Sequence, residues 1–309
     1  MKKIYNEIKS SKWRKNLTKK ILQIQLAELC SLMSPYACAP VLRKLIESKD
    51  PWLWLAGNCF ISIEPSSHEG QFNALCNDDI NACSYIDKAE FIEFLDKFAK
   101  SSEFQKKYKN HIRQEQILAN SLFEHIRDLN RIYSKLMVIR LDLSYGKTYT
   151  TDFNPECRVV NDWESFIKYT ARSFKDSFIS YAAKFEYGVE KGIHIHTLLF
   201  FDGSEVRRDV IIAQHLGEHW KTTITQRAGI YFNANTMKYK ERMKNRAIGV
   251  FKRNDADFLV GAKEIATYFA KMDPIVRWAV PGLTQTLRRS SLTFRQKSML
   301  QKYSIFDEY

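Results

Sequence analysis

The chain of 309 residues lacks the features that define several classes of protein. Its 11 glycines and 7 prolines are too few for a collagen-like or low-complexity chain. The most hydrophobic window, residues 52–63, is far shorter than the roughly 20 residues of a membrane span. The apolar stretch after the basic start, residues 21–33, is interrupted by glutamine and glutamate, and no small-residue cleavage site is present. We therefore expect neither a signal peptide nor a membrane partner.

Common metal-binding and nucleotide-binding motifs are missing as well. The cysteines form no CxxC pair, and no histidine lies at zinc-ligand spacing from them. They are Cys30, Cys38, Cys59, Cys76, Cys83 and Cys157. This pattern favours reduced, buried thiols of a cytoplasmic protein. No GxxxxGKS or GxxxxGKT segment occurs, so the chain has no P-loop. Any helicase activity that it needs is therefore expected from another protein.

What the chain does contain is apolar surface and positive charge. Apolar residues make up 45% of it and aromatic residues 13%, which is enough to build cores and excludes a wholly disordered protein. The 48 Lys and Arg exceed the 35 Asp and Glu, a net charge of +13 that indicates a polyanionic partner, with nucleic acid before anionic membrane. Residues 1–130 carry only +3 (19 basic, 16 acidic), and residues 131–309 carry +10 (29 basic, 19 acidic). The polyanion is therefore expected on the second part.

The first part, residues 1–131, is predicted to be an all-α domain or arm. Apolar residues recur at helical spacing in residues 13–33, 85–100 and 112–131, and no strand-like alternation is visible. Two roles stay open for this part, namely recognition of a specific duplex and recruitment of a partner.

The second part, residues 132–309, changes to strand-like alternation. Residues 136–145 (LMVIRLDLSY) place charged and apolar side chains on opposite faces, as in a half-buried strand. The predicted order is a strand at 136–145, a helix at 162–178, a hairpin of strands at 179–187 and 193–201, a helix at 208–221, a strand at 247–251 and a helix at 257–272. This order predicts an α+β fold with a ferredoxin- or RRM-like antiparallel sheet and its flanking helices on one face.

The segment GIHIHTLL contains the sharpest chemical signal. His194 and His196 are two apart on a predicted strand and so project from the same face. The hairpin brings Glu186, at the end of the preceding strand, back beside them, and Glu190 at the turn is a weaker candidate. Two imidazoles and one carboxylate suit a catalytic Mg²⁺ or Mn²⁺ and leave positions open for a phosphate oxygen. The alternative is a pair of histidines on a solvated strand face.

A second signal is Tyr268 with Lys271 on the predicted helix KEIATYFAKMD. Residues three apart share a helix face, so the phenol and the ammonium can meet the same phosphate, and a nearby cation favours the phenolate. The alternative is an amphipathic helix with a buried ring and a surface lysine. Tyr231, in GIYFNAN, can also approach a phosphate and ranks behind Tyr268.

Basic residues around Tyr239 and Phe251 predict contacts with nucleic acid, since cations track phosphates and rings stack on bases. The alternative is a solvated charged loop and helix. Arg140 shares a strand face with Asp142, which lies either beside the metal or in a surface ion pair. The predicted nucleic-acid contacts are Arg140, Lys238, Lys240, Arg242, Lys244, Arg246, Lys252, Arg253, Arg288 and Arg289.

Taken together, VIRLDLSY, FEYG, GIHIHTLLFFDG, HWKTTIT, TYFAKMD and LRRSSL, spread over residues 131–295, resemble the HUH endonucleases. These are rolling-circle replication initiators and their relaxase and transposase relatives. More narrowly, these segments look like the inovirus-type replication initiators of filamentous phages and prophages. It implies that His194, His196 and Glu186 bind the metal, that Tyr268 attacks a DNA phosphate as the single catalytic tyrosine, and that Lys271 assists.

The function that the resemblance implies is nicking and joining of single-stranded DNA at a replication origin, where a hairpin is expected. A 5′-phosphotyrosine intermediate would form, and a host helicase and DNA polymerase would be the partners, in the cytoplasm of a bacterial host. Relaxase or transposase activity on the same site is the first alternative, and a non-catalytic DNA-binding regulator is the second. The origin sequence, the preferred metal and the oligomeric state are not predicted.

Overall fold

A computed structural model describes residues 50–51, 54–55, 58, 97–146, 154–188, 191–273 and 276–306. The helix expected at 13–33, all but the end of that expected at 85–100, Glu190, and every cysteine except Cys157 lie outside these residues. Cys157 has a free thiol and is exposed, so the expectation of a buried thiol was wrong for this residue.

The chain divides into two compact units, Met1–Ile112 and Arg113–Tyr309. The division lies within the long helix α7 (Ser102–Ile132), whereas the sequence pattern put the boundary after residue 131. The difference arises because residues 122, 126 and 129 of this helix are apolar and pack with the second unit. In the first unit, Trp54 is buried and meets Phe98 edge-on.

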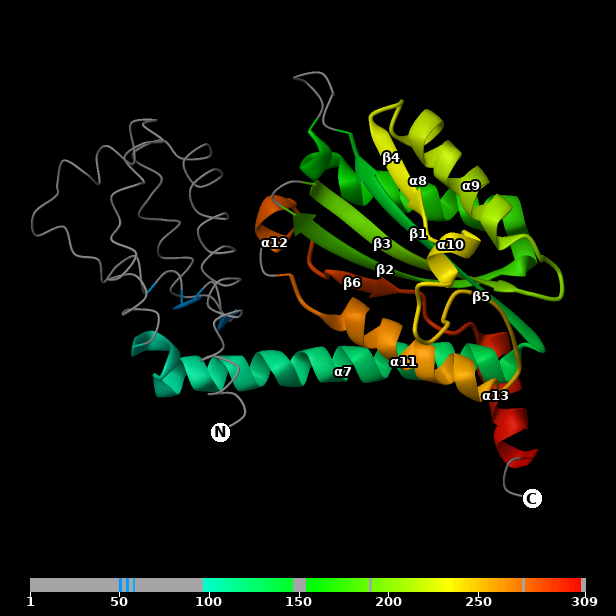
Figure 1. Cartoon of the computed structure of the whole chain (residues 1–309), viewed down its shortest axis with the longest axis horizontal. Coiled ribbons are helices and arrows are strands. Elements are labelled where there is room, and N and C mark those ends of the chain that lie inside the picture. The colour runs from blue at the N-terminus through cyan, green and yellow to red at the C-terminus, as the bar shows by residue number, and fades with distance from the viewer. Residues whose placement is uncertain are drawn as a thin grey trace, which may run out of the picture. The chain divides into compact units, whose positions relative to one another are not determined.

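The second unit is built on a six-stranded sheet in which every pair is antiparallel (Figure 1). The strands are β1 (Lys135–Tyr145), β2 (Phe178–Gly188), β3 (Gly192–Asp202), β4 (Gly229–Asn233), β5 (Gly249–Lys252) and β6 (Leu287–Arg289). Their order is β4-β1-β3-β2-β6, with β5 pairing with the first half of β1 and β4 with its second half. The predicted α+β class and the β2–β3 hairpin are confirmed.

Two of the helices begin at a residue whose side chain caps them. Asn154 accepts a hydrogen bond from the N–H of Cys157 just before α8, and Asp255 caps α11 through the N–H of Phe258 in the same way. The helices of the second unit, after α7, are α8 (Pro155–Phe174), α9 (Asp209–His219), α10 (Met237–Lys240), α11 (Ala256–Ala270), α12 (Val276–Ala279) and α13 (Phe294–Phe306). A 3₁₀ turn (Lys175–Ser177) follows α8, and a π-helical turn (Trp220–Ile224) follows α9.

Helices cover both faces of the sheet, so the expectation that all of them lie on one face was wrong (Figure 1). On the face that we call the α8 face, α8 and α9 pack against Met137, Ile139 and Leu141 of β1. On the opposite face, which we call the α11 face, α7 and α11 pack against Leu136 and Val138. The physical reason is that β1 begins with apolar residues on both faces, and each set must be buried.

The sequence did not predict the short strands β4 and β6, the four-residue helices α10 and α12, or the 13-residue helix α13. The strands β4 and β6 are five and three residues long, too short to show a clear period. The basic stretch after residue 238 contains only the end of α10, turns and β5. Gly261 allows α11 to approach this stretch, since a Cβ there would lie 2.7 Å from the carbonyl oxygen of Arg246.

Candidate metal and nucleophile site

The site lies on the α11 face. There, the neighbouring strands β1, β3 and β2 carry polar side chains in adjacent rows of the sheet. The strand register sets this arrangement. His196 of β3 is paired with Asp142 of β1 on one side and with Lys184 of β2 on the other. His194 is paired with Glu186 in the next row. Directly paired residues project from the same face, so these five side chains form one polar patch.

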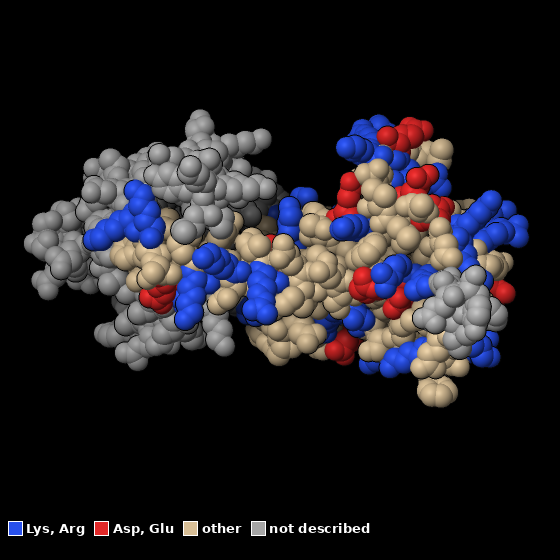
Figure 2. Space-filling model, turned by 90° about the horizontal axis from the view of Figure 1, so that it is seen from below, with Lys and Arg blue, Asp and Glu red and all other residues tan. Residues whose placement is uncertain are grey.

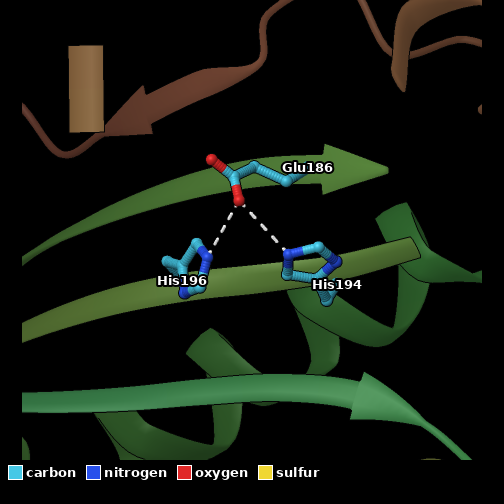
Figure 3. A group of neighbouring side chains, drawn as sticks. All are labelled: Glu186, His194 and His196. Carbon is cyan, nitrogen blue, oxygen red and sulfur yellow. Dashed lines mark hydrogen bonds and ion pairs between the residues drawn. The ribbon is translucent and has the colours of Figure 1, made fainter. Parts of the chain in front are cut away.

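Glu186, His194 and His196 form the one group of candidate metal ligands found among the described residues (Figure 3). A single oxygen of Glu186, Oε2, lies 3.2 Å from Nε2 of His194 and 3.0 Å from Nε2 of His196. Two ligands about 2.1 Å from an octahedral ion, at right angles, are about 3.0 Å apart. Each imidazole nitrogen is thus at ligand spacing from the carboxylate oxygen, and all three donor atoms lie within 4.8 Å of one another, so the cluster could hold a metal ion.

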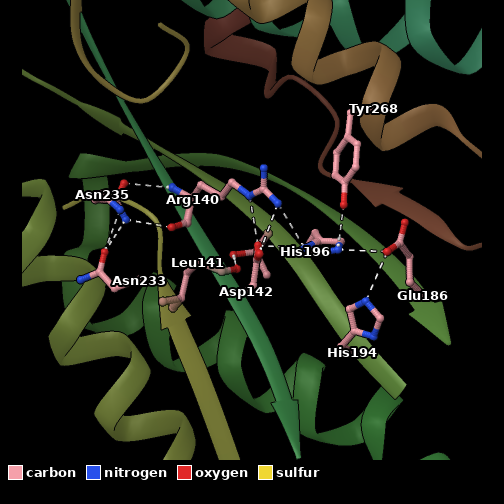
Figure 4. Close-up of polar contacts among 10 residues, drawn as sticks. Arg140, Leu141, Asp142, Glu186, His194, His196, Asn233, Asn235 and Tyr268 are labelled. Atoms are coloured by element: carbon pink, nitrogen blue, oxygen red, sulfur yellow. Dashed lines mark hydrogen bonds and ion pairs between the residues drawn. The ribbon is translucent and has the colours of Figure 1, made fainter. Parts of the chain in front are cut away.

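Asp142 orients His196, as Figure 4 shows. Its Oδ1 lies 2.9 Å from Nδ1 of His196, which leaves Nε2 facing Glu186. A carboxylate behind a histidine in this way fixes the ring and is typical of metal sites. Burial opposes protonation of His196, but the carboxylates of Asp142 and Glu186 together raise its pKa. The surroundings of His196 thus favour a positive charge, whether proton or metal.

Arg140 holds Asp142 in place. Its Nε and Nη2 donate to the two oxygens of Asp142 at 3.1 and 3.2 Å. Its own backbone is fixed by Asn235, which accepts from the N–H of Arg140 at 3.1 Å and donates to its carbonyl at 2.8 Å (Figure 4). Asp142 was expected either beside the metal or in a surface ion pair. In the structure it contacts the candidate ligand His196 as well as Arg140. Asn235 is fully buried and had no signal in the sequence.

Tyr268 reaches into this patch from α11. Its hydroxyl lies 3.1 Å from Nε2 of His196 (Figure 4). The guanidinium of Arg140 lies 5.3 Å from the centre of the ring and the ammonium of Lys184 lies 4.9 Å from it. Burial and then Glu186 raise the pKa of Tyr268, and Arg140 acts in the opposite direction. A nearby cation, Arg140, does favour the phenolate as expected, but burial and Glu186 outweigh it.

The end of α11 is anchored to the sheet and to α7. Lys184 is almost completely buried, and its ammonium donates to the carbonyl of Tyr268 at 3.2 Å and contacts Glu186. The N–H of Met272 donates to Glu115 of α7 at 2.9 Å. Asp273 accepts from the N–H of Tyr187 on β2 at 2.7 Å. These contacts hold the phenol beside the candidate metal ligands.

Lys271 does not share a regular helix face with Tyr268. The helix ends at Ala270, and Lys271 is an exposed C-cap residue with extended backbone (φ −59°, ψ 121°). The cations at the ring are Arg140 and Lys184 instead. Lys184 was missed, although its spacing of two from Glu186 on a strand was a usable signal.

The other predicted nucleophile lies on the opposite side of the sheet. The ring of Tyr231 packs against the α8 face, and its hydroxyl donates to Glu218 at 2.7 Å. Burial and this hydrogen bond raise the pKa of Tyr231 to about 12. Tyr231 is therefore separated from the polar patch by the sheet itself.

Several predicted nucleic-acid contacts are engaged within the protein. Lys240 forms an ion pair with Asp209 at the start of α9. Arg253 donates to the carbonyl of Ile132 at 3.1 Å and lies over Tyr303. Arg288 lies over Phe185, Arg289 donates to Ser121 at 3.0 Å, and Arg246 lies over Phe251. These arginines make contacts within the protein, and Arg246 and Arg289 are also exposed to solvent.

The remaining predicted contacts are exposed: Lys238, Arg242, Lys244 and Lys252. The first three lie in or just after α10, next to β4. Seen from the side of α7, lysine and arginine form separate groups between neutral surface (Figure 2). The positive charge of the second unit is thus distributed, and the α10 segment is a local concentration of exposed cations.

Comparison with protein-family models, curated proteins and solved structures found no match to this chain. Among the helices that the structure describes, none has both the length and the apolar character that crossing a membrane requires. The geometry of the polar patch is therefore the basis for assigning a function.

Proposed function

We propose that the protein is a metal-dependent, single-tyrosine DNA endonuclease of the HUH class. It would nick and rejoin single-stranded DNA at a replication origin of a filamentous phage or prophage, and so start rolling-circle replication in the cytoplasm of a bacterial host. The observation that carries this proposal is the position of the Tyr268 hydroxyl, 3.1 Å from Nε2 of the candidate ligand His196. A nucleophile beside a metal-ligand set is the arrangement that phosphoryl transfer to a protein side chain needs.

The donor set supports a divalent cation, Mg²⁺ or Mn²⁺. Two imidazoles favour Mn²⁺ over Mg²⁺, whose ligands are almost always oxygens. When bound, the ion supplies Lewis-acid polarisation of a non-bridging oxygen of the scissile phosphate. With only three protein ligands, the set leaves positions where such an oxygen can bind.

The residues of the chain have distinct roles in this proposal. Tyr268 forms the new phosphorus–oxygen bond while the bond to the 3′-oxygen breaks, and in net terms the phenolic proton moves to that oxygen. Arg140 and Lys184 flank the ring and add positive charge where the phosphorane becomes most negative. The resulting 5′-phosphotyrosine ester retains the bond energy, so the strand can be rejoined without ATP.

The test is formation of a covalent adduct on origin-derived single-stranded oligonucleotides with Mn²⁺, measured on a denaturing gel. Tyr268→Phe should abolish the adduct and leave binding intact. Tyr231→Phe is the matched control, because it removes a hydroxyl from the opposite face of the sheet, and it should form the adduct normally. An adduct in Tyr268→Phe, or equal loss in both variants, would contradict the assignment.

The same experiment separates the alternatives. A relaxase or transposase would form the same adduct but give transferred or inserted strands instead of circles. A non-catalytic regulator would bind the oligonucleotide and form no adduct with any metal. A hairpin in the substrate and addition of host helicase and polymerase would test the proposed partners, since rolling-circle initiation requires both.

A further inference from the structure

Besides the polar patch, the α11 face carries an exposed apolar strip on β4. Phe232 is paired with Asp142 and therefore projects from the same face as His196 and Glu186. Phe232 is 51% exposed, and Ile230, two residues earlier on the same face, is 49% exposed. Tyr231 between them is turned into the core of the α8 face. The strip is therefore a consequence of strand alternation and faces the site.

A second ring stands against Phe232. Tyr239 of α10 meets it with ring centres 5.5 Å apart and planes at 70°. This edge-on contact leaves a face of Phe232 open while fixing its orientation. We call these two rings, which meet at an angle, the aromatic shelf (Phe232 and Tyr239).

The aromatic shelf adjoins the metal-ligand set. Phe232 and His196 lie in the same row of the sheet, with only Asp142 of β1 between them. Two strand spacings amount to about 10 Å. Stacked nucleotides advance about 3.4 Å each, so a base on Phe232 would be no more than about three nucleotides from the scissile phosphate.

The charge beside the aromatic shelf indicates the chemistry of its occupant. The exposed cations Lys238 and Arg242 lie one and three residues from Tyr239 in sequence, so positive charge accompanies this ring. A hydrophobic peptide would not use these cations, whereas single-stranded DNA offers both phosphates and unpaired bases. Stacking of bases on aromatic rings combined with a basic track is typical of single-strand binding.

We propose that the aromatic shelf is a nucleobase-stacking subsite for single-stranded DNA, which seats a base of the strand that crosses the metal-ligand set. This inference rests on the proposed function for its choice of ligand. The added contact does not distinguish one base from another, because every nucleobase has a stacking face. It would help to position the strand next to Tyr268.

The experiment measures equilibrium binding of a labelled oligothymidylate of about 20 nucleotides, and of the same strand with abasic sites, by fluorescence anisotropy in EDTA. EDTA prevents cleavage, so the result does not depend on nuclease activity. Phe232→Ala should weaken binding of oligothymidylate about 5- to 150-fold, from the usual 1–3 kcal/mol per stacked base. Its affinity for the abasic strand should match that of the unaltered protein.

Three further variants keep the test decisive. Phe232→Trp retains a stacking ring and should bind oligothymidylate like the unaltered protein. Phe294→Ala removes the most exposed phenylalanine of the described residues, on α13, and should have no effect. Lys238→Ala should instead lower the salt dependence of binding, because it removes a phosphate contact.

Several outcomes would overturn the aromatic shelf. They are unchanged binding by Phe232→Ala, an equal loss on the abasic strand, an equal loss in Phe294→Ala, or a loss in Phe232→Trp as large as in Phe232→Ala. A change of oligomeric state in Phe232→Ala would assign the strip to a second copy of the chain. If only the proposal for the aromatic shelf is wrong, the protein should still form the adduct through Tyr268. If the nuclease proposal alone is wrong, the stacking effect remains without an adduct.

Discussion

The two faces of the central sheet use the same strands for different purposes. On the α8 face, buried apolar side chains continue along β1 from Met137 to Tyr145, and aromatic rings such as Trp163 and Phe166 fill the space under α8. On the α11 face, the core ends after Val138, and Arg140 and the other polar side chains begin there. Along β1, one face is therefore apolar over its full length, whereas the other replaces apolar side chains with polar ones at the site.

The largest effect is expected when the polar patch loses a candidate ligand. His194→Ala should reduce adduct formation by ~1000-fold, because the remaining donors no longer hold an ion at the scissile phosphate. Thermal stability should hardly change, since His194 lies outside both hydrophobic cores. Chelation of metal from the unaltered protein should reproduce the loss, and adduct formation that survives both treatments would contradict a metal site.

The opposite result is expected on the α8 face. Trp163→Ala removes a fully buried ring that contacts Phe166, Tyr181 and Phe185. The free energy of unfolding should fall by about 3–5 kcal/mol, measured by chemical denaturation. Adduct formation below the new melting temperature should remain. A loss smaller than about 1 kcal/mol would mean that this core is not packed as described.

Acid should act through the α11 face. His125 of α7 is buried, its Nε2 lies 2.6 Å from the hydroxyl of Ser180, and burial followed by Arg289 lowers its pKa to about 4. The unfolded chain, with an ordinary value near 6.5, binds the proton more readily. Stability should therefore decrease as the pH falls from about 6.5 to about 4, by about 2–3 kcal/mol.

His125→Leu is the control for that pH effect. It keeps an apolar group under α7 and removes the titration, so its free energy of unfolding should change less between pH 7 and pH 4. Denaturation at the two pH values compares the variant with the unaltered protein. Identical pH dependence in both would show that His125 is not the responsible group.

The smallest expected effect distinguishes the two lysines near Tyr268. Lys184→Met should slow adduct formation about 10- to 100-fold, because it removes the ammonium that joins Glu186 to the carbonyl of Tyr268. Lys184→Arg should recover part of the rate by restoring the charge. Lys271→Met serves as the comparison, since Lys271 is exposed beyond the end of α11, and it should change the rate severalfold less. A greater loss in Lys271→Met would reverse these assignments.

Much of this site could be predicted from local sequence patterns. Strand alternation alone placed His194 and His196 on one face, and the short turn after Gly188 returned the chain so that Glu186 pairs with His194. The apolar spacing of α11 likewise predicted a helix that carries Tyr268. These features depend on backbone geometry over a few residues, and a pattern reports such geometry directly.

Contacts between distant segments could not be predicted in that way. The helices α7 and α11 had to cover a particular face of the sheet before Tyr268 could meet His196, which is 72 residues away. The same packing brought Lys184 to the carbonyl of Tyr268 and Asn235 to the backbone of Arg140. In both cases burial selects the partners, because a polar group removed from water must be satisfied by whatever the fold brings near.

The charge pattern, the pair of histidines and the tyrosine-bearing helix are therefore properties of the chain itself, set by composition and by the periods of strand and helix. Three features depend on the folded molecule. They are the cations beside the ring of Tyr268, the contact of Asp142 with His196 and the position of the aromatic shelf. They arise because the sheet has two faces that are buried by different helices, and only long-range packing settles which side chains share a face with which helix.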